Sequence, residues 1–258
     1  MAEAATAIAL GLAIGLFSGT FGVGGSSIGT PLLRLVLGSP ALIALGSPLP
    51  AALPTAVSGG IVYLREGLIN VKAVLWTVLG GIPTIVLGSI LTLWVPSRWL
   101  MFLVGFMVLL AGMQMLRTSP PERMAGTLRS RSLTWHNPSG PAFLALGACV
   151  GLLSGLLANG GGSLLVPAFV LLFGTTVREA AATSLPCVAL MTIPGVVTHA
   201  LLGHVDGWLA LYLGLGVVPS TYLGASLSVR MSGVRLRRPF GALMGAFAVY
   251  FILRELSK

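Results

Sequence analysis

Charged residues are scarce in this sequence, and acidic residues are the scarcest of them. Only 8% of the 258 residues are charged, and six are aspartate or glutamate. A globular domain of this length needs about a quarter of its residues charged to hydrate its surface. The shortage excludes a soluble domain. It also leaves the apolar segments without carboxylates, so a proton relay of buried acidic side chains is not expected.

Disulfide frameworks, nucleotide-binding motifs and catalytic pairs are missing as well. The two cysteines, Cys149 and Cys187, both lie in apolar segments, so neither a disulfide framework nor a metal site is expected. The sequence contains no GxxxxGK[ST] motif, which argues against ATP hydrolysis. No nucleophile and base occur together near the glycine-rich motifs described below. A membrane-embedded enzyme is therefore the weakest of the functions considered, and no cofactor is expected.

Long apolar runs take the place of charge. Hydrophobic residues make up 55% of the chain, and the runs 35–64, 73–97 and 207–229 contain no charged residue. Each run is long enough to cross a bilayer core of about 30 Å, which takes roughly 20 helical residues. The N-terminal apolar run lacks the basic segment of a signal peptide, so we expect it to be a retained membrane helix. The sequence predicts an all-α integral membrane protein whose surroundings are the lipid bilayer.

A glycine-rich phrase occurs twice in the chain. GLFSGTFGVGGSSIGTP begins at Gly15, and GLLSGLLANGGGSLLVP begins at Gly151, 136 residues later. The same offset continues without a gap as far as Gly105 and Gly241. A repeat that keeps register over this distance predicts two related halves. We assign an N-terminal membrane repeat to 1–116, a polar linker to 117–140 and a C-terminal membrane repeat to 141–258.

Each half is predicted to contain a glycine-broken hairpin followed by three apolar spans. The hairpins cover 4–37 and 141–173, and the spans cover 41–64, 72–95 and 98–116, then 179–202, 207–229 and 236–253. The second arm of each hairpin, near 26–37 and 162–173, has about 12 residues, or roughly 18 Å of helix, too short to cross the bilayer. We therefore expect re-entrant or broken hairpins whose glycine segments lie within the membrane.

Basic residues set the predicted topology. The net charge of +9 comes from residues between apolar segments, so membrane orientation explains it and nucleic acid is not an expected partner. The positive-inside rule places the linker in the cytoplasm. Eleven of the 15 basic residues then lie on that side: Arg65, Lys72, Arg117, Arg123, Arg129, Arg131, Arg178, Arg230, Arg235, Arg237 and Arg238. Equivalent loops fall on opposite sides, which predicts inverted repeats with both termini outside.

The glycine phrases are the candidate binding site. A helix that starts inside the membrane exposes unpaired backbone amides and the positive end of its dipole, and glycine lets an anion approach them. The candidate substrate-binding residues are Gly24, Gly25, Ser26 and Ser27 in the first half, and Asn159, Gly160, Gly161, Gly162 and Ser163 in the second. Helix packing needs only one small residue per turn, so consecutive glycines favour a site. For Gly15, Gly19, Gly151 and Gly155 we favour close packing.

Three further residues are candidates for coupling or gating. His199 lies within a span and aligns with Tyr63 under the repeat offset. It either couples transport to protons or is a histidine hydrogen-bonded within the bundle. Arg34 falls in the short arm of the first hairpin, and there we favour snorkelling to the outer surface over attraction of anions to an outer vestibule. No metal site is expected.

The doubled pattern GxxSGxxGxGGSxxxxP resembles the TauE/SafE family of membrane transporters, over nearly the whole chain. This resemblance implies transport of small sulfur-containing anions, such as sulfite and organosulfonates, across a bacterial inner membrane. The second copy departs from the pattern, with Ala158 in place of Gly22 and Asn159 in place of Val23. An asparagine facing the site would influence which anion is selected.

The function predicted is therefore a secondary transporter, an exporter of a small sulfur-containing anion. An anion channel of the same architecture is the alternative, in which the same helix amides form a filter. The partners expected are the small anion and the lipid bilayer, with a homodimer left open.

Overall fold

The structure is a computed structural model that describes residues 2–21, 25–65, 67–117, 139–230 and 233–256. These ranges are helical and contain no strand, which confirms the predicted all-α class. The helices are α1 (Ala2–Phe21), α2 (Gly25–Val36), α3 (Ala41–Gly46), α4 (Leu49–Arg65), α5 (Val71–Leu91), α6 (Ser97–Arg117), α7 (Gly140–Leu157), α8 (Gly162–Phe173), α9 (Val177–Leu201), α10 (Gly207–Arg230) and α11 (Gly233–Leu256).

Two helices, α2 and α8, are much shorter than the helices that precede them, α1 and α7. Each has 12 residues, and each follows one of the glycine phrases, at the positions expected for the second arms of the hairpins. At 1.5 Å per residue they extend about 18 Å, so neither crosses a bilayer core alone. Both pack into the bundle, with Leu33 of α2 and Phe169 of α8 fully buried.

The apolar span expected over 41–64 is wrong as a single helix, because the chain forms α3 and α4 with a turn at Ser47 and Pro48. Proline has no N–H to donate to the preceding turn, and its ring clashes with that turn's carbonyl. The equivalent of Pro48 in the second half is Ser184, and there α9 continues unbroken. The remaining predicted spans agree with the observed helices to within a few residues.

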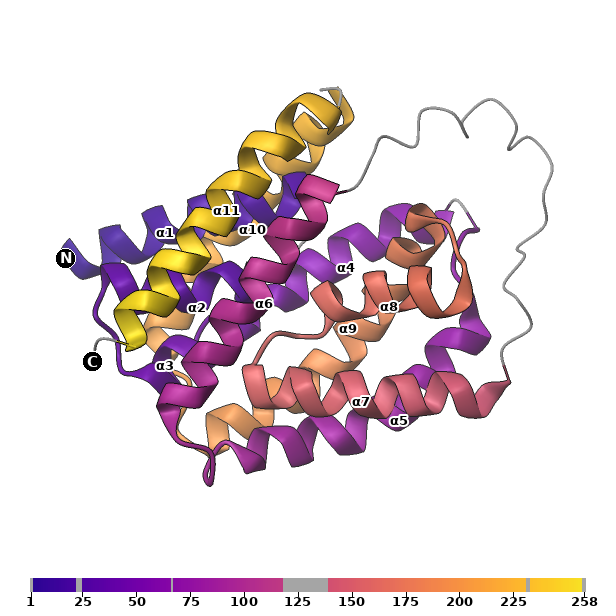
Figure 1. The fold of residues 1–258 in the computed structure, drawn as a ribbon, viewed down its shortest axis with the longest axis horizontal. Coiled ribbons are helices and arrows are strands. Elements are labelled where there is room, and N and C mark those ends of the chain that lie inside the picture. Colours follow the sequence, from indigo (N-terminus) through magenta and orange to yellow (C-terminus); the bar gives the residue numbers. More distant parts are fainter. Residues whose placement is uncertain (1, 22–24, 66, 118–138, 231–232, 257–258) are drawn as a thin grey trace.

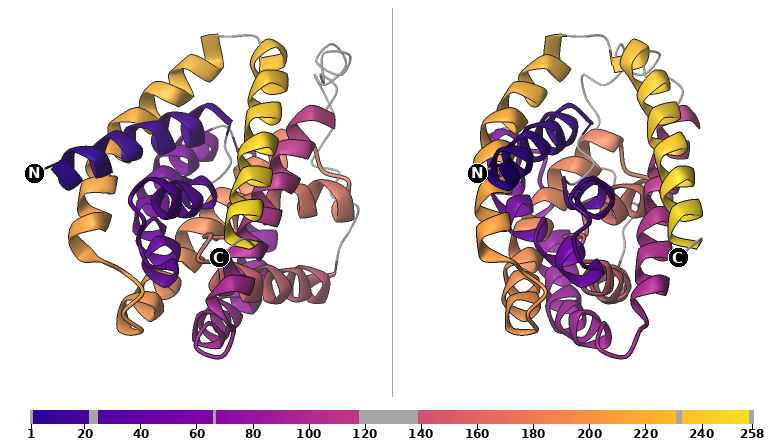
Figure 2. Two further views of the ribbon diagram at one scale, coloured as in Figure 1. Left: turned by 60° about the vertical axis from the view of Figure 1, so that its left-hand side comes forward. Right: turned by 90° about the vertical axis from the view of Figure 1, so that its left-hand side faces the viewer.

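Long helices pack in pairs that are distant in sequence. α1 lies along α10, α5 lies along α7, and α6 lies along α11. Figure 2 shows the α1–α10 and α6–α11 pairs on opposite sides of the bundle, with α2 between them, and Figure 1 shows α5 beside α7. The short helix α2 is therefore flanked by long ones, whereas α8 packs mainly against α9.

Glycines make the closest of these pairings. Gly15 lies against the backbone of Val217 in α10, and Gly151 lies against that of Gly81 in α5. Gly155 is in similar contact with the Ile85 carbonyl of α5. A Cβ at any of the three positions would collide with the neighbouring helix. The expected packing role is thus confirmed for Gly15, Gly151 and Gly155.

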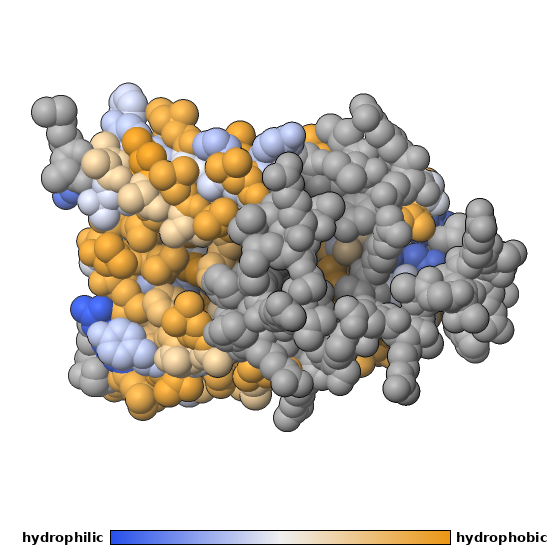
Figure 3. Space-filling model, turned by 90° about the horizontal axis from the view of Figure 1, so that it is seen from above, coloured by the Kyte–Doolittle hydropathy of each residue, from blue (hydrophilic) through white to orange (hydrophobic). Residues whose placement is uncertain are grey.

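The outside of the bundle is apolar. Large hydrophobic side chains such as Leu171, Leu201 and Trp208 are more than two-thirds exposed. Figure 3 shows a face on which hydrophobic residues predominate wherever the chain is described. Among the described residues, four helices are long and apolar enough to cross a membrane, over Glu3–Thr20, Val71–Leu91, Gly140–Leu157 and Glu179–Leu201. An exposed apolar surface of this extent fits a multi-pass membrane protein.

Candidate functional site

The second glycine phrase breaks the chain between α7 and α8. α7 ends at Leu157, and Ala158, Gly160 and Gly161 have φ angles of 46°, 63° and 86°. Glycine enters this left-handed region without the steric cost of a Cβ. In the described ranges, Ala158 is the only residue other than glycine that has a positive φ. Residues 154–161 are all buried. The break therefore brings irregular backbone into the protein interior.

The N-terminus of α8 opens onto this break. Its N-cap residue is Gly161, which has no side chain to accept from the first amides of the helix. Those amides carry the positive end of the helix dipole. Gly162 starts the helix and lies against Val188 of α9. In the first half, Gly25 starts α2 and lies against Ile14 of α1, while Gly24 is outside the described residues.

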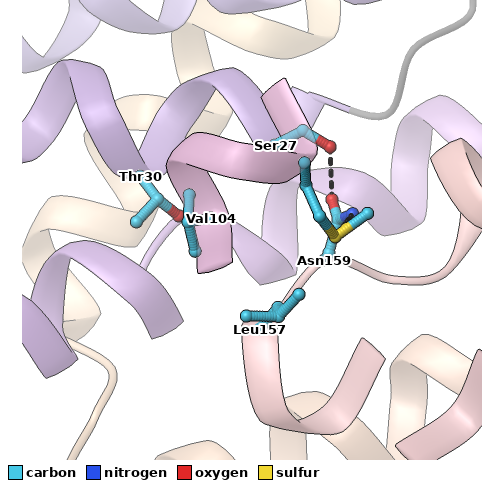
Figure 4. A pocket seen from close by; sticks show the side chains of 6 residues that line it. Ser27, Thr30, Val104, Leu157 and Asn159 are labelled. Carbon is cyan, nitrogen blue, oxygen red and sulfur yellow. Dashed lines mark hydrogen bonds between the residues drawn. The ribbon is translucent and has the colours of Figure 1, made fainter. Parts of the chain in front are cut away.

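The Asn159 side chain joins the two glycine phrases. Its Oδ1 accepts hydrogen bonds from Ser27 Oγ and, at 3.3 Å, from Ser26 Oγ, both at the start of α2. Its Nδ2 donates to Ser163 Oγ of α8 at 2.6 Å. Figure 4 shows Ser27 of α2 directed at Asn159, which lies in the irregular segment after α7. Four predicted site residues, separated by up to 137 positions from Ser26 to Ser163, thus form one hydrogen-bond network, in which Ser26, Ser27 and Asn159 are buried.

A small cavity adjoins the network. It has a volume of about 10 Å³ and is lined by Ser27, Thr30, Val104, Met107, Leu157 and Asn159. That volume is about enough for one water molecule. None of the lining side chains is ionisable, so hydroxyl, amide and backbone dipoles provide its polarity. Hydrogen bonding is the chemistry this arrangement offers.

Thr30 lines the cavity and is a candidate that the sequence did not reveal. It lies one helical turn after Ser26 and donates from Oγ1 to the Ser26 carbonyl at 3.3 Å. Its position three residues after Ser27 was a usable signal, because positions three and four apart share a helix face.

His199 is buried beneath the break. Its Nε2 is 2.8 Å from the Gly155 carbonyl in the last turn of α7, and its Nδ1 is 3.1 Å from Nδ1 of His204. A carbonyl only accepts, so Nε2 is the donor, and Nδ1 of a neutral His199 accepts from His204. His204 lies beyond the end of α9, and its burial lowers its pKa below the ordinary 6.5.

Comparison with known proteins agrees with the geometry. The profile of the family described as "Sulfite exporter TauE/SafE" matches residues 7–251. The chain belongs to the TauE/SafE family. Its relatives include the probable membrane transporter protein YunE of Bacillus subtilis (strain 168), 25% identical over 87% of both chains. YjnA of the same organism is 29% identical, over 87% of this chain and 90% of its own.

A third TauE/SafE relative, a probable membrane transporter protein of Xylella fastidiosa (strain 9a5c), is 28% identical over 95% of this chain and 92% of its own. No solved structure matches the chain. These relatives are named as membrane transporters, which confirms the expectation of a multi-pass transporter rather than an enzyme. Their names specify no substrate and no direction of transport.

Arg34 of this TauE/SafE chain is paired with an acid. Its Nε donates to Glu255 Oε1 at 2.9 Å, and its Nη1 donates to the Ser39 carbonyl at 2.9 Å. Glu255 is 6% exposed and lies in the last turn of α11. The ion pair ties the end of α2 to the end of α11. Tyr63 falls in α4, and its side chain is outside the described residues.

Proposed function

We propose that this protein is a secondary transporter that exports a small sulfur-containing anion, such as sulfite or an organosulfonate. The observation that carries the proposal is the network in which the buried Asn159 forms hydrogen bonds with the first turns of both α2 and α8. Helix N-termini attract anions, and glycine-broken helices at matching positions are the usual location of substrate sites in transporters with repeated halves.

The donors at the site suit an anion that must also leave. Ser26, Ser27 and Ser163 are hydroxyl donors, and Asn159 offers an amide donor, all without fixed charge. The positively charged Arg34 is held by Glu255 at the other end of α2. Backbone and neutral donors stabilise an oxyanion without the strong attraction of an unpaired arginine or lysine.

We further infer that 1–116 and 141–258 are inverted repeats joined by the linker 117–140. Support comes from contacts that recur at the offset of 136 residues. Gly11 lies against Leu213, and the equivalent Gly147 lies against Thr77. The α1–α10 pairing is likewise the equivalent of the α7–α5 pairing. With the basic loops on the cytoplasmic face of a bacterial inner membrane, both termini lie outside.

The small volume beside Asn159 favours a transporter over the alternative, an anion channel. A cavity of about 10 Å³ is too small for sulfite. Binding therefore requires α2 and the α7–α8 break to move apart, and the Ser27–Asn159 hydrogen bond to open. A site that must rearrange in each cycle fits alternating access, whereas conduction needs a continuous series of weak sites.

The test is flux through the purified protein in proteoliposomes. Sulfite, sulfoacetate, taurine and sulfate are compared side by side, with outward and inward gradients. Saturable flux of sulfite or a sulfonate, without single-channel currents in planar bilayers, is the expected result. Unitary currents would favour the channel, and the absence of flux for all four compounds would reject the proposed substrate class.

A further inference from the structure

Two buried hydroxyl groups beside the glycine break lack hydrogen-bond partners. Ser154 of α7 and Thr192 of α9 are both 0% exposed. Within the described residues, Ser154 Oγ and Thr192 Oγ1 make no hydrogen bond. Buried polar groups are nearly always paired, so each such hydroxyl requires a physical explanation.

The absence of these hydrogen bonds is not explained by a lack of nearby acceptors. Several other buried hydroxyls in helices donate to the carbonyl one turn back, as Ser89 does to Ile85 at 2.8 Å and Ser220 does to Gly216 at 2.7 Å. Ser154 and Thr192 are also inside helices, where the same acceptor lies four residues back. Neither of their hydroxyls makes that bond.

Both hydroxyls face the left-handed glycines of the break. A Cβ built on Gly161 would lie 3.0 Å from Ser154 Oγ, and one built on Gly160 would lie 3.0 Å from Thr192 Oγ1. The two groups come from different helices and lie against consecutive residues. They therefore border, from two directions, the backbone that leads into the N-terminus of α8.

We propose that Ser154 and Thr192 are substrate ligands, whose hydroxyls bind the oxygens of the anion when it occupies the α8 N-terminus. This inference rests on the proposed function and extends its site. A sulfite or sulfonate group carries three oxygens that point in different directions and accept hydrogen bonds. The amides of α8 reach such a group from one side only. Ser154 and Thr192 add donors from α7 and α9, and a hydroxyl also accepts a hydrogen bond from a protonated anion such as bisulfite.

The experiment replaces each hydroxyl and includes a matched control. Ser154→Ala and Thr192→Val remove the proposed ligands, while Thr77→Val removes another hydroxyl that is 0% exposed and unpartnered but lies where α5 packs on Gly147. Sulfite and methanesulfonate are the probes. We expect KM for flux to rise about tenfold or more in the first two variants, as for a lost hydrogen bond to a charged group, and to stay unchanged in Thr77→Val.

Thermal stability gives the second readout. Without substrate, all three variants should have a Tm equal to or above that of the wild type, because an unpaired buried hydroxyl has been removed. With sulfite, the rise in Tm should shrink in Ser154→Ala and Thr192→Val only. Thr192→Ser, which keeps the hydroxyl, should restore both KM and the substrate-dependent rise in Tm.

Two results would overturn the assignment while leaving the transporter intact. One is wild-type KM and a wild-type Tm response in both Ser154→Ala and Thr192→Val. The other is a drop in Tm without substrate, which would show that the hydroxyls have structural partners. Failure of the wild-type protein to transport or respond to either probe is a different result, and it would reject the proposed function together with these ligands.

Discussion

At the scale of single residues, Asn159 is the position that links the two halves of the proposed site. It stands where the first glycine phrase has Val23, and its amide contacts the first turns of both short helices. Because the difference between the two phrases is visible in sequence, Asn159 could be identified as a candidate from sequence alone. Its partners could not, since no local pattern says that residues 132 positions apart will meet.

Asn159→Asp tests the sign of the charge that the site accepts. The change keeps the shape and the acceptor but replaces the Nδ2 donor by a charged oxygen, which repels an anion. We expect kcat/KM for sulfite to fall at least tenfold in proteoliposomes. Asn70→Asp is the matched control, because Asn70 caps α5 by accepting from the Ala73 amide and aspartate caps equally well. Equal flux in both variants would contradict an anion at Asn159.

His204 makes stability depend on pH. Burial lowers its pKa from 6.5, so the unfolded chain binds more protons than the folded one once the pH falls through 6.5. The free energy of unfolding should therefore decrease between about pH 7 and pH 5. His204→Gln, which does not titrate, should flatten this decrease in Tm measured in detergent. An unchanged pH profile in the variant would show that other groups dominate.

At the scale of elements, the break before α8 contains left-handed glycines that are tightly packed, whereas left-handed glycines elsewhere border open space. Gly161 and Gly174 have φ angles of 86° and 65°, but a Cβ at Gly161 meets Ser154 whereas one at Gly174 meets nothing within 4 Å. Gly161→Ala and Gly174→Ala should share a backbone penalty of about 1 kcal/mol. Only Gly161→Ala should also lose transport, and Gly161→Val or Gly25→Val should abolish it with the protein still in the membrane.

The packing of long helices against each other depends on small residues at the contact. Gly151 lies against Gly81 and the Thr84 hydroxyl of α5, whereas Gly245 of α11 has nothing within 4 Å of a built Cβ. Gly151→Val should separate α7 from α5 and lower the yield of monodisperse protein in size-exclusion chromatography. Gly245→Val should behave as the wild type. Similar elution profiles for both would mean that the α5–α7 contact tolerates a wider spacing.

The number and lengths of the helices could be predicted where apolar runs and glycine pairs indicate the helix ends. The 12-residue helices α2 and α8 follow directly from the distance between glycines and the next polar turn. The division of the span 41–64 was missed because Pro54, Pro83 and Pro186 all lie inside helices, so proline alone does not mark a break. Which proline interrupts a helix depends on tertiary contacts that can replace the lost hydrogen bond.

At the scale of the whole molecule, the charge near the two glycine phrases determines which valence of anion the proposed site would favour. None of the residues that line the cavity beside Asn159 is ionisable, and Arg34 is paired with Glu255. Each helix N-terminus is equivalent to roughly half a positive charge, so the starts of α2 and α8 together provide about one. A monoanion balances this charge. A dianion leaves about one negative charge uncompensated in a medium of low dielectric constant.

The protein should therefore prefer monoanions to dianions of similar size. In proteoliposomes at neutral pH, methanesulfonate should inhibit sulfite flux at concentrations at least tenfold lower than sulfate does. Lowering the pH, which converts sulfite to the monoanion bisulfite, should raise the apparent affinity for total sulfite while leaving that for methanesulfonate unchanged. Methanesulfonate thus controls for effects of pH on the protein itself. Stronger inhibition by sulfate would mean that a cation, from the chain or from solution, completes the site.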